Sequence, residues 1–196
     1  MCARYEVSDP PTKIAAQLEA SIAGEIPPRA TIAPTDTAPA LIVVDGARLL
    51  VPMKFGWPST RPKERVHLNT RAESAARGDS AEALASRRCL LPANAFHEWS
   101  GPKGTRAHHL FAAAASAPLF TMAGLYLPGE SDAPARFVIL TTAASREVRP
   151  FHDRMPLVVP DELRARWLAV LDEDPDQLLA RVRGADPPRM LDRLST

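Results

Sequence analysis

Proline is the residue that most limits how this chain can fold, because 20 of its 196 residues are proline and they occur from residue 10 to residue 188. A proline inside a helix removes a backbone hydrogen bond and clashes with the preceding turn. We therefore expect many turns and loops and few long helices. The length suits one domain with a sizeable hydrophobic core.

Short strand patterns fill most of the chain. The strongest is a hairpin in which residues 40–44 and 48–51 flank Asp45-Gly46, a pair that favours a tight turn. Further strands are expected at 1–7, 89–92, 95–99, 108–112, 119–125, 137–142 and 154–159.

Helical patterns are fewer. Ile14, Leu18 and Ile22 recur every four residues, which predicts a helix over 13–23, with Thr12 as its N-cap. Further short helices are expected in two pieces within residues 74–87, broken near Gly78-Asp79, and at 162–171 and 176–183. Turn residues predict loops at 26–34, 56–62 and 101–104.

Many strands with few helices between them argue against a doubly wound α/β fold, in which the two alternate. We expect instead an α+β domain with a curved, mostly antiparallel, barrel-like sheet and peripheral helices. This domain is predicted to span residues 1–184, and residues 185–196 are predicted to form a loose C-terminal tail.

The bulk composition excludes several classes of function. A net charge of +1 gives no global field for nucleic acid, so such binding must come from a local patch. No apolar run approaches the ~18 residues that span a bilayer. Two cysteines are too few for a disulfide scaffold. We expect a cytoplasmic protein that does not bind a membrane.

Cys2 is the most reactive feature of the sequence. Removal of Met1 would leave it as a 1,2-aminothiol, whose amine condenses with an aldehyde and whose thiol then closes a five-membered thiazolidine on the same carbon. An α-amine titrates at about 7.7–8.0 and a free thiol at about 8.5, so both nucleophiles are accessible near neutral pH. The plain alternative is a small buried hydrophobe, which most cysteines are.

Three further segments carry polar residues that a plain core or turn would not need: residues 67–73, residues 88–99, and residues 141–144 together with 151–156. With Met-Cys-Ala-Arg at the start, they resemble the motifs of the SOS-response-associated peptidase (SRAP) family, in order and across roughly residues 1–160. That family includes abasic-site shield proteins of bacteria and animals. It is known for a thiazolidine crosslink between the processed N-terminal cysteine and an abasic sugar in single-stranded DNA.

The resemblance implies a catalytic set of Cys2, Asn69, Glu98 and His152. The closed abasic sugar must open to an aldehyde before Cys2 can attack, and Glu98 suits this step if burial raises its pKa. His152 is expected to act on the sugar oxygen, and Asn69 to orient the Cys2 amine or the sugar. The plain alternatives are a surface carboxylate, a structural histidine and an Asx turn or helix cap.

The resemblance also implies contacts to DNA phosphates. Arg4, Arg71 and Arg154 are the candidates, because a planar guanidinium donates two parallel hydrogen bonds to a phosphate. For each of them a salt bridge, to Glu73 or Asp153, is the alternative.

Three more residues are DNA-binding candidates. Pro34 and Thr141 match family positions near the bound strand, and Trp57 is expected to stack on a base unless it belongs to the core. The tryptophan-rich loop of the family is reduced here to residues 55–60, which removes aromatic stacking surface.

Other functions stay open. A cysteine peptidase acting on other proteins would use Cys2 in a substrate cleft, whereas a non-covalent single-strand-binding module would not need a terminal cysteine. The resemblance favours an enzyme, an autopeptidase or abasic-site processing protein with Schiff-base chemistry. We expect it to act as a monomer. We expect no metal or other cofactor, because no CxxC or HExxH spacing joins the scattered Cys2, Cys89, His97, His108, His109 and His152.

Overall fold

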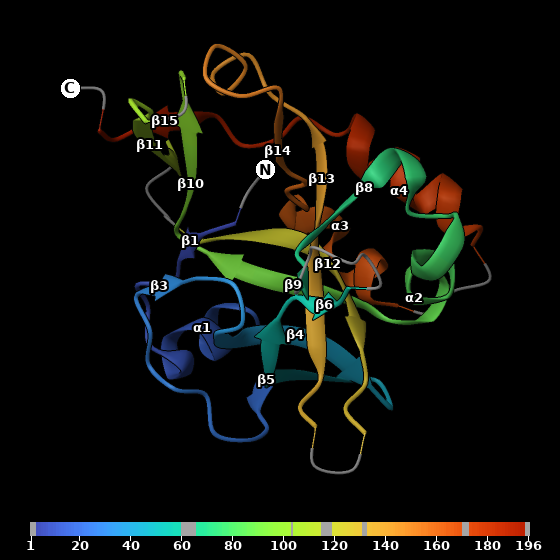
Figure 1. Cartoon of the computed structure of the whole chain (residues 1–196). Helices are drawn as coiled ribbons and strands as arrows, with labels where there is room; N and C mark the ends of the chain where they lie inside the picture. Colours follow the sequence, from blue (N-terminus) through green and yellow to red (C-terminus); the bar gives the residue numbers. More distant parts are fainter. Residues whose placement is uncertain are drawn as a thin grey trace.

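The computed structural model describes residues 3–59, 66–102, 104–114, 119–130, 133–169 and 173–194. Over these residues the chain forms mostly antiparallel sheets with a few short helices (Figure 1), so the α+β class expected from the sequence is confirmed. Met1 and Cys2, residues 60–62 of the expected loop and residues 170–171 of an expected helix lie outside the described residues.

The strands and helices follow one another in short segments. The strands are β1 (Tyr5–Glu6), β2 (Ser21–Ile22), β3 (Thr31–Ile32), β4 (Thr37–Val44), β5 (Ala47–Phe55), β6 (Trp57–Pro58), β7 (Val66–His67), β8 (Asn69–Arg71), β9 (Arg88–Ala93), β10 (Ala95–Ser100), β11 (Ala107–Ala113), β12 (Phe120–Leu127), β13 (Arg136–Ala143), β14 (Arg154–Pro156) and β15 (Met190–Asp192). The helices are α1 (Pro11–Gln17), α2 (Ala81–Ser86), α3 (Asp161–Leu168) and α4 (Pro175–Gly184), with 3-10 turns at Ala72–Ser74 and Gly78–Ser80.

The larger sheet closes on itself. Its strands follow the order β14-β13-β12-β9-β4-β5-β2, and β5 also pairs in parallel with β13, with Phe55 opposite Phe137. The rings of these two residues stack with centroids 5.1 Å apart inside the closed ring of strands. The barrel-like sheet is therefore confirmed. So is its hairpin, since Asp45 and Gly46 both adopt the positive φ that a type I′ turn requires.

Glycine is required at one point of the barrel wall. A Cβ atom at Gly124 of β12 would lie 2.8 Å from the Cys89 Sγ and 2.9 Å from a Leu91 methyl group on the neighbouring strand β9.

On the outside, α3 covers β9 through the Trp167 indole, which donates to the Cys89 carbonyl at 2.9 Å. Arg88, the first residue of segment 88–99, donates to the Trp167 carbonyl at 2.7 Å, so it fastens α3 to the barrel.

The smaller sheet has the order β15-β11-β10-β1-β3, and all its pairings are antiparallel. The short N-terminal strand β1 lies between β10 and β3, with Tyr5 opposite Phe96 and Ile32. This arrangement buries Tyr5 completely and sets strand β1 against segment 88–99.

The helix expected over 13–23 is wrong beyond Gln17. Helix α1 is preceded by Pro10, so Thr12 lies inside it and is not its N-cap. The positive φ of Glu19 reverses the chain, and Ser21–Ile22 then pairs with Leu49–Leu50 as strand β2. The backbone pairing with β5 therefore decides the local structure here, although the four-residue spacing of apolar residues is that of a helix. Ile22 stays exposed on this edge strand.

The loose C-terminal tail is also wrong for residues 190–192. These form β15, which pairs with Phe111, Ala112 and Ala113 of β11, and Met190 is buried. The sequence contains no turn signal for this pairing because its partner strand lies far away in the chain.

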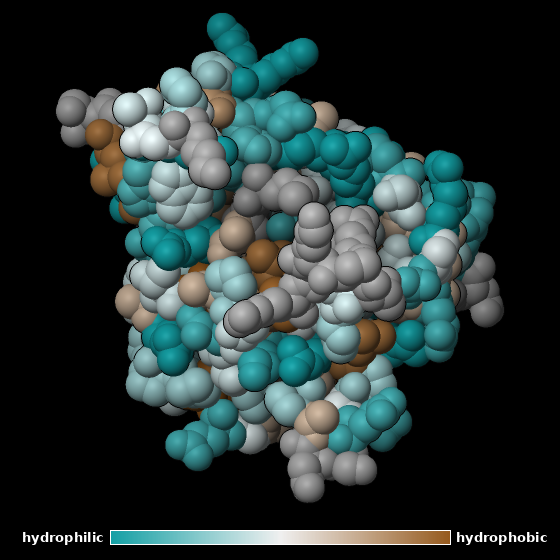
Figure 2. Space-filling view, viewed as in Figure 1, coloured by the Kyte–Doolittle hydropathy of each residue, from teal (hydrophilic) through white to brown (hydrophobic). Residues whose placement is uncertain are grey.

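No helix in the described part of the chain is long and apolar enough to cross a membrane. On the face viewed in Figure 2, hydrophilic residues cover most of the surface and hydrophobic ones are confined to small areas. No large apolar face is therefore evident on this side.

Candidate active site

Glu98 lies on the inner face of β10. Side chains alternate along a strand, so Phe96, Glu98 and Ser100 share one face, and His97 and Trp99 share the other. Only 2% of Glu98 is exposed, which excludes a surface carboxylate. Burial raises its pKa above the ordinary value, because a carboxylate loses hydration there, while the nearby His152 opposes the shift. A carboxyl group with a raised pKa holds its proton more readily and so suits proton transfer.

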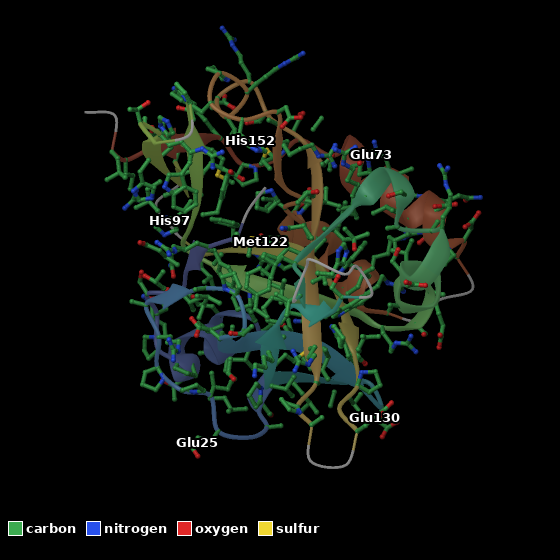
Figure 3. The ribbon with its side chains drawn as sticks, in the orientation of Figure 1. Glu25, Glu73, His97, Met122, Glu130 and His152 are labelled. Atoms are coloured by element: carbon green, nitrogen blue, oxygen red, sulfur yellow. The ribbon has the colours of Figure 1, made fainter. Side chains whose placement is uncertain are left out.

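His152 faces Glu98 from the loop before β14. Its Nε2 lies 3.9 Å from the Glu98 Oε2. Its Nδ1 lies 3.0 Å from the Arg154 N–H and 2.9 Å from the Arg154 carbonyl oxygen, so the backbone of Arg154 holds the ring in either tautomer. In Figure 3, His152 and His97 are labelled on either side of the β10 ribbon. Glu98 and His152 thus form a candidate acid–base pair where the two sheets meet.

Asn69 begins β8, which pairs in parallel with β13 and sets Asn69 opposite Ile139. Its Oδ1 is buried and accepts no hydrogen bond from any residue that the structure describes. Leaving a buried acceptor unsatisfied costs about 1–3 kcal/mol, so such an atom is a candidate for binding a ligand. Neither an Asx turn nor a helix cap uses this oxygen within the described chain.

The N-terminal segment runs beside Glu98, although Cys2 itself lies outside the described residues. The Arg4 carbonyl accepts from the His97 N–H at 3.0 Å, which continues the antiparallel β1–β10 pairing past Tyr5. The Arg4 guanidinium lies 5.7 Å from the centre of the Trp99 ring, on the other face of β10, within cation–π range. The chain therefore leads toward its N-terminus along the strand that carries Glu98.

Arg154 is held in a salt bridge with Glu73, the alternative to phosphate binding. Its guanidinium contacts both carboxylate oxygens, at 3.0 and 2.7 Å, and donates to the Thr141 carbonyl at 2.6 Å. Arg183 of α4 reaches the same carboxylate at 3.3 Å. The hydrogen bond from Arg154 is the main reason that the pKa of Glu73 is lowered. A phosphate at Arg154 would therefore have to compete with Glu73.

Arg71 is placed differently. It is exposed, it lies opposite Thr141 across the β8–β13 pairing, and it forms no ion pair with the residues that the structure describes. Among the described residues, the salt-bridge alternative therefore finds no support for Arg71.

The other three DNA-binding candidates differ in exposure. Trp57 is only 6% exposed and its indole N–H donates to the Arg136 carbonyl at 3.1 Å, so it belongs to the core and offers no free face to a base. Thr141 is 1% exposed and serves to anchor Arg154. Pro34 lies half-buried in a turn that Asp36 closes by accepting from the Ala33 N–H at 3.0 Å.

The remaining histidines pair with other side chains. The His97 Nδ1 lies 2.6 Å from the His108 Nε2 on the outer face of the smaller sheet, and burial lowers the pKa of His97 to about 4. His109, on the inner face, contacts Asp192 and Ser100. Within the described ranges, no three His, Cys, Asp or Glu side chains are grouped as metal ligands would be. The contacts of His109 were not foreseen, because the strand of Asp192 was expected to be a tail.

Comparison with known proteins defines the class to which this fold and site belong. The model of the SOS response associated peptidase (SRAP) family matches residues 1–191, and the chain therefore belongs to this family. The resemblance seen in its motifs is confirmed.

Individual relatives are more distant. The abasic site processing protein YobE of Bacillus subtilis (strain 168) is 30% identical over 163 residues, which cover 79% of this chain and 74% of that protein. The abasic site processing protein YoqW of the same organism is 28% identical over 175 residues, covering 85% and 78%.

Solved structures show the same fold. A protein from Bacteroides thetaiotaomicron matches with a TM-score of 0.79 at 19% identity, over 93% of this chain and 86% of that one. A protein from Bordetella bronchiseptica matches with a TM-score of 0.76 at 21% identity, over 97% of both chains.

Proposed function

We propose that this chain, after removal of Met1, binds single-stranded DNA and traps abasic sites covalently through a thiazolidine ring formed on Cys2. The observation that carries the proposal is the buried Glu98 carboxyl with His152 3.9 Å away, on the strand beside which the N-terminal segment runs. Family membership and relatives that are named abasic site processing proteins support it.

The first step is opening of the sugar. An abasic deoxyribose is mostly a closed hemiacetal, so the proton on its O1′ must leave while the ring oxygen O4′ gains one. Glu98 and His152 can share these two transfers, one as base and one as acid, because a sugar lying beside the pair would present both oxygens of C1′ to side chains that are 3.9 Å apart. The products are a C1′ aldehyde and a 4′-hydroxyl group.

The second step is capture of the aldehyde. The α-amine of Cys2 adds to C1′, and loss of one water molecule gives an imine. The Cys2 sulfur then attacks the same carbon, its proton passes to the imine nitrogen, and the five-membered ring closes. Glu98 is suited to protonating the departing hydroxyl group, since burial favours its neutral form. The unsatisfied Asn69 Oδ1 is available to orient the amine or the sugar.

Phosphate contacts would hold the strand over this site. Arg71 and Arg4 are exposed on the two segments that flank it, and Arg154 would join them only by exchanging Glu73 for a phosphate. Such a local patch is compatible with a net charge of +1. We propose that the protein acts in this way as a monomer in the cytoplasm.

Crosslinking assays separate this function from its alternatives. The mature protein should form a heat-stable adduct with an abasic single strand. It should form none with an intact strand, or with an abasic strand whose aldehyde has been reduced by borohydride. Cys2→Ala should form no stable adduct. A stable adduct in that variant would overturn the proposal. Binding without any adduct would favour the non-covalent module, and cleavage of added polypeptides that is lost in Cys2→Ala would favour the peptidase.

A further inference from the structure

Asp192, His109 and Ser100 form a hydrogen-bonded array on the inner face of the smaller sheet. The Asp192 Oδ2 lies 2.7 Å from the His109 Nδ1, and the His109 Nε2 lies 2.8 Å from the Ser100 Oγ. The other carboxylate oxygen, Oδ1, accepts from the backbone N–H groups of Leu110 and Leu194, each at 3.1 Å. In the tautomer that donates its Nδ1 proton to Asp192 in a hydrogen bond, the His109 Nε2 accepts from the Ser100 hydroxyl.

Two contacts join this array to the acid–base pair. His109 is the residue directly opposite Glu98 in the β10–β11 pairing, where side chains on one face come into contact. The His109 ring also packs on Phe151, with ring centroids 4.3 Å apart, and Phe111 contacts both rings, at 5.7 Å from Phe151 and 6.1 Å from His109. Phe151 is the residue immediately before His152.

We propose that Asp192 is a positioning residue: it fixes the His109 ring, which in turn supports Phe151 and sets the distance between His152 and Glu98. Only 6% of His109 is exposed, and the Asp192 side chain is buried to a similar degree. A ring that is hydrogen-bonded at both nitrogens cannot rotate freely, so its packing face toward Phe151 is constant. The C-terminal strand β15 thereby becomes part of the active site.

The same order of contacts occurs in the Ser-His-Asp triads of hydrolases. Here the His109 ring packs on Phe151, the residue before His152, and its partner across the strands is Glu98. Two neighbours of His109 therefore connect it to the acid–base site. This placement favours a supporting role over a nucleophilic one for Ser100.

The test compares Asp192→Asn with Asp186→Asn, which removes the same charge from an exposed position in the same C-terminal segment. Histidine-ring signals are recorded by ¹⁵N NMR without DNA, and the His152 signals are identified by their loss in His152→Ala. Asp192→Asn should shift the ring signals of His152 as well as those of His109, and Asp186→Asn should shift neither. Since a displacement of about 1 Å can cost up to ~10²-fold in rate, we expect crosslinking to slow about tenfold in Asp192→Asn. Binding to an intact single strand should not change.

The crosslinking arm rests on the proposed function, but the NMR arm does not. A wild-type protein that forms no adduct would refute the proposed function, and the His152 signals would still test the positioning role. A folded Asp192→Asn variant with unchanged His152 signals and unchanged crosslinking would overturn the proposal. If Asp192→Asn does not fold, Phe151→Leu decides, because it removes the ring contact without touching the array. Labelling of Ser100 by a fluorophosphonate would also overturn it, in favour of a nucleophile.

Discussion

The Glu98 Oε2 and the His152 Nε2 lie 3.9 Å apart, although Glu98 belongs to β10 of the smaller sheet and His152 to the loop that leads into β14 of the larger sheet. The acid–base pair therefore exists only when the barrel and the smaller sheet are packed together. This relationship explains why its parts are scattered through the sequence, and it leads to predictions that address each part separately.

Replacing the carboxyl group should separate chemistry from binding. Glu98→Gln keeps the size of the buried side chain but cannot exchange a proton, so crosslinking to an abasic strand should slow by about 10²-fold or more. Affinity for an intact strand should stay the same, because Glu98 is 2% exposed and offers no contact to a phosphate. Single-turnover crosslinking and fluorescence anisotropy measure the two quantities. Equal losses in both would show that Glu98 supports the fold and not the reaction.

The same substitution should raise stability at neutral and alkaline pH. Burial raises the pKa of Glu98 in the folded chain, so the folded state binds this proton more tightly than the unfolded state does. The resulting stabilisation is complete below the ordinary carboxyl pKa of about 4.3 and is lost as the pH rises through the higher, folded-state value. The melting temperature of Glu98→Gln should therefore exceed that of the wild type by more at pH 8 than at pH 4.5. Thermal melts across this range test the sign, and a difference that shrinks as the pH rises would show that Glu98 is stabilised in its charged form.

Arg71 and Arg154, the two arginines beside Thr141, should contribute differently to the binding of single-stranded DNA. Arg71→Ala should weaken binding to single-stranded DNA and lower the slope of log affinity against log salt by roughly 0.7, the value of one phosphate contact. Glu73→Gln should strengthen binding, because it releases Arg154 from a bidentate ion pair.

The matched control for these variants is Arg48→Ala, which removes an arginine that pairs with Glu19 at 2.9 Å in the β4–β5 hairpin. Its salt slope should equal that of the wild type. An unchanged slope in Arg71→Ala, or weaker binding in Glu73→Gln, would count against the proposed phosphate patch.

Cys89 should be inert in the folded protein. It is completely buried in β9, and burial raises the pKa of its thiol, so almost no thiolate is present to react. Because the chain has two cysteines, iodoacetamide should modify only Cys2 in the native state and both after unfolding. Peptide mapping of the two samples gives the answer. Rapid native labelling of Cys89 would remove the reason to assign a crosslink to Cys2 alone.

The parts of the fold that could be predicted are those with a local signal. Asp45-Gly46 specifies its own turn, so the β4–β5 hairpin follows from neighbouring residues. The burial of Glu98 follows from its place between Phe96 and Trp99 in a strand of apolar character. Both depend on contacts within a few residues, which a sequence displays directly.

The parts that could not be predicted depend on distant partners. Ile22 continues a helical spacing of apolar residues, but Ser21–Ile22 pairs with β5 as a strand. Asp192 has no local signal for its pairing with β11. Arg154 could form an ion pair or bind a phosphate. The ion pair with Glu73 forms because β14, which carries Arg154, and β8, which precedes Glu73, both pair with β13.

The most direct test of the account is mass spectrometry of the crosslinked protein after digestion. The crosslinked N-terminal peptide should begin at Cys2, without Met1, and should carry the mass of the abasic deoxyribose and its strand less one water molecule. Borohydride treatment should leave this mass unchanged, because a thiazolidine contains no reducible imine. A retained Met1 on the crosslinked peptide, an adduct on any other residue, or a gain of two hydrogens on reduction would contradict it.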